Sequence, residues 1–79
     1  MAKHIIIASS YIEARDESRA LVRDGVAWRD ILAFTPRSGM IHLRGYTLTA
    51  DDKVTWHSRH RMTPEFIKAA EETIAMVTR

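Results

Sequence analysis

The sequence contains no cysteine, only three glycines and two prolines. Without cysteine there can be no disulfide, no thiol chemistry and no thiolate metal site, so packing alone must hold the core. No stretch approaches the roughly 20 apolar residues that span a bilayer. The short apolar run near the N-terminus also lacks the length and small-residue cleavage site of a signal peptide. We therefore expect a cytoplasmic protein with no membrane partner.

An excess of charge of one sign is also missing. Twelve Lys and Arg residues stand against ten Asp and Glu, a formal net charge of +2, which does not by itself indicate nucleic-acid binding. Hydrophobic residues make up 46% and charged residues 28% of the 79 residues, as in ordinary globular proteins. The chain is therefore expected to form a single domain, residues 1–79, with one small core.

The clearest pattern lies at the N-terminus, where an apolar run at residues 3–8 leads through Ser9-Ser10 into a charged helical pattern. The run of β-branched residues predicts a central strand. Ser10 is the expected N-cap of the helix, with the Glu13 side chain reaching back to its amide in a capping box, and Gly25 is the expected C′ residue. The helical positions expected to face the sheet are Tyr11, Ala14, Ser18, Leu21 and Val22.

The remaining elements follow from shorter signals. Residues 30–34 predict a second strand, closed by Thr35-Pro36 and parallel to the first through a right-handed crossover. Residues 37–45 suggest a loop or one helical turn. Residues 46–49 predict a third strand, with 54–56 either its hairpin partner or an irregular edge. Thr63-Pro64 predicts the start of a last helix that continues to about Val77.

Together these elements predict an α/β fold. We expect a small sheet of three to four strands with two helices, in the order β-α-β-β-(β)-α, resembling a Rossmann-like sheet without a phosphate loop. Neither a Walker A motif nor a G-x-G-x-x-G fingerprint is present, so no nucleotide cofactor is expected. No nucleophile elbow is present either, and no catalytic residue or enzymatic activity is predicted.

Two polar regions are candidate contact sites. Ser9 and Ser10, at the end of the first strand, could hold an anion, although helix capping is the simpler interpretation. The stretch from His57 to Arg61, beside Trp56, is the densest basic segment and could contact phosphates, although a solvated loop is the simpler interpretation. A metal site is not expected, because His57 and His60, three residues apart, would act together as ligands only on a helix, and the predicted helix starts later, at Thr63-Pro64. The full candidate set is Ser9, Ser10, Arg37, Arg44, Trp56, His57, Arg59, His60 and Arg61.

The four largest aromatic residues are Tyr11, Trp28, Tyr46 and Trp56. Most of them are expected to complete the core, with one or two left exposed. An exposed aromatic side chain among arginines has the composition of a protein-interface hot spot.

Several short motifs resemble those of small uncharacterised accessory proteins from phages of actinobacteria. They are Ala8-Ser9-Ser10-Tyr11 with Glu13-Ala14-Arg15, then Trp28-Arg29, Thr35-Pro36-Arg37-Ser38 and the Leu43-Arg44-Gly45 step. The resemblance covers roughly residues 5–49. It implies a small accessory protein made in the cytoplasm of an infected bacterial cell, and it implies no catalytic residues.

Two classes of function follow. The first is a noncatalytic module that binds a host or phage protein through a sheet edge, exposed aromatic residues and arginines. The alternative is a nucleic-acid or nucleotide binder that uses Ser9-Ser10, Arg37, Arg44 and the His57 to Arg61 patch. Because a small sheet leaves unpaired edges, we also expect a homodimer.

Overall fold

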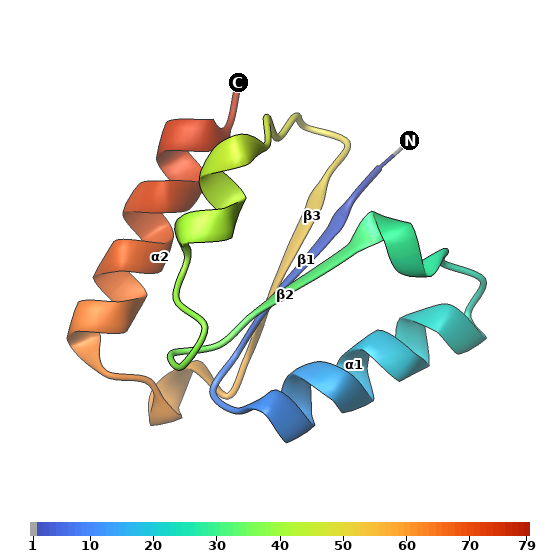
Figure 1. The fold of residues 1–79 in the computed structure, drawn as a ribbon, viewed down its shortest axis with the longest axis horizontal. Helices are drawn as coiled ribbons and strands as arrows, with labels where there is room; N and C mark the ends of the chain where they lie inside the picture. The colour runs from blue at the N-terminus through green and yellow to red at the C-terminus, as the bar shows by residue number, and fades with distance from the viewer. Residues whose placement is uncertain (1) are drawn as a thin grey trace.

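The computed structural model describes residues 2–79. Its centre is a three-stranded parallel sheet in the order β2-β1-β3, formed by β1 (His4–Ala8), β2 (Ile31–Phe34) and β3 (Lys53–His57). Helix α1 (Tyr11–Arg23) covers one face and helix α2 (Pro64–Val77) covers the other (Figure 1). The predicted class, a small α/β sheet with two helices, is confirmed. No helix among the described residues is long and apolar enough to cross a membrane.

The central strand is buried on both faces, which explains its unbroken apolar sequence. Ile5 and Ile7 belong to the larger cluster, on the α2 side, whereas Ile6 and Ala8 pack against Ala14 of α1. The larger cluster therefore contains most of the core and anchors α2. Its other buried members are Phe34, Met40, Leu43, Leu48, Met62, Ala70 and Val77.

The ends of both helices follow the local signals in the sequence. Ser10 caps α1 by accepting a hydrogen bond from the Glu13 N–H at 3.4 Å, and Thr63 caps α2 by accepting one from the Phe66 N–H at 3.2 Å. Gly25 follows α1 with a φ of +101°, a conformation that favours glycine. The reciprocal half of the predicted capping box is wrong, because the Glu13 carboxylate instead binds the hydroxyls of Ser9 and Ser58.

The third strand is not where the sequence placed it. Residues 46–49 contribute only one isolated bridge, between Leu48 and Thr78, and β3 at Lys53–His57 runs parallel to β1 rather than forming a hairpin. The Asp52 carboxylate explains the shift: it accepts hydrogen bonds from the N–H of Lys3 at 2.6 Å and of Thr49 at 2.8 Å. These bonds close a turn beside the start of β1, so the residues that follow pair with β1.

Two shorter expectations have different outcomes. The segment that could be a loop or a helical turn contains a 3₁₀ turn, η2 (Ile41–Gly45), which lies beside α2. The expectation that most large aromatic residues complete the core is wrong: Tyr11, Trp28 and Tyr46 are exposed, and only Trp56 packs against the larger cluster. Tyr11 stands in the first turn of α1, where its side chain lines the depressions beside the β2 edge without being buried.

Candidate interaction surface

The carboxyl ends of β1 and β3 lie at the position where open α/β sheets usually bind ligands. The chain leaves β1 toward α1 on one face and leaves β3, through the 3₁₀ turn η3 (Arg59–Arg61), toward α2 on the other face. Two adjacent strands whose connections depart to opposite faces form a topological switch point. The side chains at these two strand ends are therefore the first place to look for a site.

At the switch point, one carboxylate joins the two connections. Glu13 of α1 accepts hydrogen bonds from the hydroxyls of Ser9 and Ser58, and its Oε2 lies 3.4 Å from Nδ1 of His57. Together these groups tie the start of α1 to the end of β3. The space in which a ligand would meet both connections is thus occupied by the chain's own side chains.

The same cluster contains serine, histidine and glutamate but not the geometry of a catalytic triad. In a triad the nucleophile and the acid use different nitrogens of the imidazole. Here Ser58 Oγ lies 3.3 Å from His57 Nδ1, and Glu13 Oε2 lies 3.4 Å from the same nitrogen. The Ser58 hydroxyl donates to Glu13, so the arrangement serves to hold the two loops together.

Ser58 is held in an unusual backbone conformation. Its φ of 58° and ψ of 43° place it in the left-handed region, which is uncommon for residues other than glycine. Such conformations persist where surrounding contacts hold them, and here the hydrogen bond to Glu13 is such a contact. It connects Ser58 directly to α1.

The environment of Glu13 strongly favours its ionised form. Hydrogen bonds from Ser58 and Ser9, with smaller contributions from the charges of His57 and Arg61, lower its pKa from 4.5 to about 2. The native state therefore binds this proton less readily than the unfolded chain. The resulting stabilisation is fully present above about pH 4.5 and is lost as the pH falls toward 2.

We expect Glu13→Gln to reduce the loss of stability on acidification. The free energy of unfolding, measured by urea denaturation at several pH values between 5 and 2, should fall less steeply in this variant than in the wild type. Some slope should remain, because hydrogen bonds from the Lys3 and Thr49 amides also lower the pKa of Asp52. The measurement thus isolates the contribution of one carboxylate.

Glu17→Gln is the matched control, because Glu17 lies on the same helix and makes no side-chain hydrogen bond or ion pair within residues 2–79. This variant should keep the wild-type acid slope. Equal slopes for the Glu13 and Glu17 variants would contradict the role assigned to Glu13.

The predicted basic stretch is partly engaged within the chain. The Arg59 guanidinium lies 4.4 Å from the centre of the Trp56 ring, and its Nη2 lies 3.2 Å from Oε1 of Glu71. The positive charge of Arg61 helps to lower the pKa of Glu13. The Trp56 face that could have stacked on a base is thus covered by Arg59, while His60 is exposed.

The other predicted contact residues lie in separate places. Arg37 lines a depression with Ser9 and Ser10 at the carboxyl end of the sheet, beside the start of α1. Arg44, in η2, lines a different depression with Glu72 of α2. In Figure 1, η2 lies beside α2 and η3 lies at the opposite end of that helix. The fold therefore does not gather Arg44 with the His57 to Arg61 stretch.

A longer surface runs between α1 and the outer edge of β2. Three depressions of about 520, 250 and 660 Å³ adjoin there, the first two sharing Trp28 and the last two sharing Tyr11. We call this continuous surface the Trp28 groove. Its lining residues are Ser9, Ser10, Tyr11, Ala14, Arg15, Asp16, Ser18, Arg19, Val22, Arg23, Trp28, Ala33, Thr35, Arg37 and Ser38.

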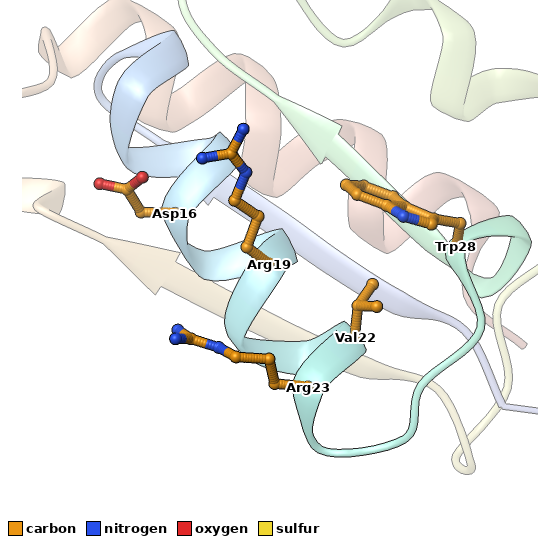
Figure 2. Close-up of a pocket in the computed structure, with 5 residues that line it drawn as sticks. All are labelled: Asp16, Arg19, Val22, Arg23 and Trp28. Atoms are coloured by element: carbon orange, nitrogen blue, oxygen red, sulfur yellow. The ribbon is translucent and has the colours of Figure 1, made fainter.

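The two aromatic side chains of the groove are strongly exposed, Trp28 at 59% and Tyr11 at 73%. Figure 2 shows the end of the groove at Trp28: the indole and Val22 lie on the β2 side of α1, while Arg23 and Asp16 extend to the other side. The Trp28 side chain thus borders the depression between helix and sheet edge without being covered. A partner could contact its apolar surface directly.

The groove carries a net positive charge. Arg15 pairs with Asp16 at 3.4 Å, the one acidic residue in the lining. Arg19, Arg23 and Arg37 form no ion pair within residues 2–79. Arg19 and Arg37 therefore remain available to a partner in the groove, while Arg23 extends to the other side of α1 (Figure 2). Except for Ser9, Ser10 and Arg37, the groove residues were not among the predicted contact residues.

The sequence offered one signal for this surface: tryptophan and tyrosine among arginines. It could not indicate which aromatic side chains are exposed, because that depends on how the helices and connections pack against the sheet. The chain matches no protein-family model, no curated protein and no solved structure. The surface must therefore be interpreted from its own chemistry.

Proposed function

We propose that this protein is a noncatalytic binding module that engages another protein through the Trp28 groove. The observation that carries the proposal is the pair of uncovered aromatic side chains, Tyr11 and Trp28, beside unpaired arginines. Tryptophan, tyrosine and arginine are the residues most enriched in interface hot spots. Contiguous exposed apolar surface of this kind is typical of interaction sites.

The contacts that the basic residues make within the chain favour a protein over a nucleic acid as the partner. Arg59 is engaged with Trp56 and Glu71, and Arg44 lies apart beside α2. A nucleic-acid site would need basic groups aligned with the phosphate backbone and uncovered aromatic faces for the bases. The basic stretch meets neither condition, because Arg59 covers Trp56 and Arg44 lies apart from it.

The identity of the partner and the formation of a homodimer remain predictions from the sequence. The resemblance to phage accessory proteins names a host or phage protein in the bacterial cytoplasm as the partner. Homodimer formation also remains open, and the groove does not require it. The experiment that follows therefore uses lysate of the bacterial host in which the protein is made.

Trp28→Ala is expected to abolish capture of the partner. Immobilised wild-type protein should retain a specific protein from nuclease-treated lysate, because a hot-spot tryptophan contributes about 2 kcal/mol or more to binding, roughly thirtyfold in affinity. Mass spectrometry of the retained proteins measures the loss. Tyr46→Ala is the matched control, since Tyr46 is also an exposed aromatic but lies outside the groove.

Equal retention by the wild type and the Trp28 variant would contradict the proposal. Retention that disappears with nuclease treatment, and with Arg59→Ala and Arg61→Ala combined, would favour the nucleic-acid alternative. Circular dichroism should show that each variant is folded. This matters little for Trp28 itself, because its exposed side chain adds little to the core.

A further inference from the structure

We propose that the Trp28 groove takes an extended acidic segment of the partner, which adds as a fourth strand to the outer edge of β2. The inference rests on the proposed function and specifies the chemistry of the partner. Strand addition supplies affinity through main-chain hydrogen bonds and specificity through the side chains that flank the edge. Strand addition requires main-chain N–H and C=O groups of β2 that point away from β1.

The direction of each residue in the sheet follows from one hydrogen bond. The Lys53 N–H donates to the Lys3 carbonyl at 2.9 Å, and in a parallel ladder alternate residues direct their main-chain groups to the same neighbour. Odd-numbered residues of β1 therefore face β3, and even-numbered residues face β2. Given the register of β1 with β2, Leu32 and Phe34 face β1, so Ala33 directs its N–H and C=O outward.

Two further hydrogen bonds agree with this assignment. The Ile31 N–H donates to the Trp28 carbonyl, and the Thr35 N–H donates to Ser38 Oγ at 3.0 Å, so both amides point away from β1. The N–H groups of Ile31 and Thr35 therefore already have hydrogen-bond partners. Ala33 lies between them, and no hydrogen bond outside the ladder engages its main chain within residues 2–79.

The position of Ala33 makes it the natural attachment point. It is exposed, and it lines the part of the groove between Tyr11 and Trp28. A segment bonded to its N–H and C=O would run beside both aromatic side chains. The outward main chain of Ala33 and the two aromatic side chains are therefore placed to contact one extended ligand.

The two edges of the sheet differ in how they are protected. Natural edge strands commonly carry lysine or proline, which discourages pairing with another chain. β3 begins with the exposed Lys53, whereas the four residues of β2 are all apolar. The β2 edge, which borders the groove, therefore carries no lysine or proline within the strand.

Charge selects an acidic segment over a second copy of this chain. Of the unpaired arginines that line the groove, Arg19 and Arg37 remain available to an added strand, whereas Arg23 extends to the side of α1 away from β2 (Figure 2). Antiparallel pairing of two β2 edges about a twofold axis would place the two α1 helices on the same face, with their arginines near one another. Glutamate or aspartate side chains on an added strand would instead meet these guanidinium groups.

The test uses an acetylated eight-residue peptide in which valine alternates with glutamate, titrated into ¹⁵N-labelled protein. The amide signal of Ala33 and the indole signal of Trp28 should shift together at millimolar peptide. The same peptide with lysine in place of glutamate should bind at least about tenfold more weakly, because it repels the arginines. Ala33→Pro, which removes the outward N–H, should weaken binding by about tenfold.

Val54→Pro is the matched control, because Val54 directs its N–H outward on the other edge strand and proline is tolerated at such positions. It should leave the peptide affinity unchanged. If Ala33→Pro does not fold, Ala33→Glu and Ala33→Lys replace it, and the glutamate variant should bind the acidic peptide more weakly than the lysine variant.

Three results would overturn the inference: no shift at millimolar peptide, equal binding of the glutamate and lysine peptides, or unchanged affinity in Ala33→Pro. The proposed function fails separately. If the partner captured from lysate is lost with Trp28→Ala but kept with Ala33→Pro, the groove remains the binding surface and only strand addition is wrong.

Discussion

Replacing Ile7 with alanine is expected to lower the free energy of unfolding by about 3 to 5 kcal/mol. Ile7 has no exposed surface, lies on the central strand and packs in the larger cluster beneath α2. The strands on both sides fix its surroundings, so the cavity cannot close easily. Because a domain of this size has only about 5 to 15 kcal/mol of stability, the variant should be close to unfolding.

Guanidinium denaturation followed by circular dichroism measures this loss. Ile12→Ala is the matched control: Ile12 is 60% exposed on α1, so its truncation should change stability by no more than about 0.5 kcal/mol. Similar losses for the two variants would contradict the assignment of the larger cluster as the main core.

Leu43→Ala is expected to lower the free energy of unfolding by about 2 to 5 kcal/mol, although Leu43 lies in a short 3₁₀ turn and not in a helix or strand of the main fold. Leu43 has no exposed surface and joins η2 to the larger cluster beside α2. Without its side chain, the long connection between β2 and β3 would lose one of its three buried apolar residues, the others being Met40 and Leu48. The same denaturation measurement tests the expectation.

Ile41→Ala serves as the control, because Ile41 lies in the same 3₁₀ turn but is 67% exposed. It should have little effect. Equal stability of the Leu43 and Ile41 variants would show that η2 is not anchored as described.

The first part of the fold could be predicted because its signals are local. The unbroken apolar run of β1, the Ser10 cap and Gly25 each act over a few residues. The same holds for α2, whose start at Thr63 and Pro64 was predicted by residue. Capping groups and backbone constraints of this kind are decided by the immediate sequence.

The third strand could not be predicted in the same way. Residues 46–49 and 53–57 have comparable β-propensity, and the choice between them depends on tertiary contacts. Leu48 is held by α2, through its N–H to the Val77 carbonyl at 2.8 Å, while Asp52 joins the following turn to Lys3. Both contacts connect residues far apart in the chain, which no local pattern reveals.

The site was predictable only in part, for a similar reason. Glu13 fits the local pattern of a capping box, yet its carboxylate accepts a hydrogen bond from Ser58, 45 residues away in the sequence. Tyr11 fits the stripe of α1 that faces the sheet, yet its side chain is exposed and lines a depression beside the β2 edge. In both cases the sequence indicates the residue, but its contacts depend on the assembled fold.

The closed switch point and the open edge of β2 together explain why the groove is the better candidate. Ser9, Ser58 and Glu13 satisfy one another where α/β folds usually bind ligands. The uncovered aromatics and the outward main chain of Ala33 lie instead along the side of the sheet. This placement suits an extended partner more than a small molecule.

Hydrogen–deuterium exchange of the protein alone and in complex with the captured partner tests the central claim most directly. The proposal predicts new protection in residues 11–23 and 28–38, which form the Trp28 groove, with no change along β3 and α2. Protection confined to residues 53–61 and 64–77, with the groove still exchanging as in the free protein, would contradict it.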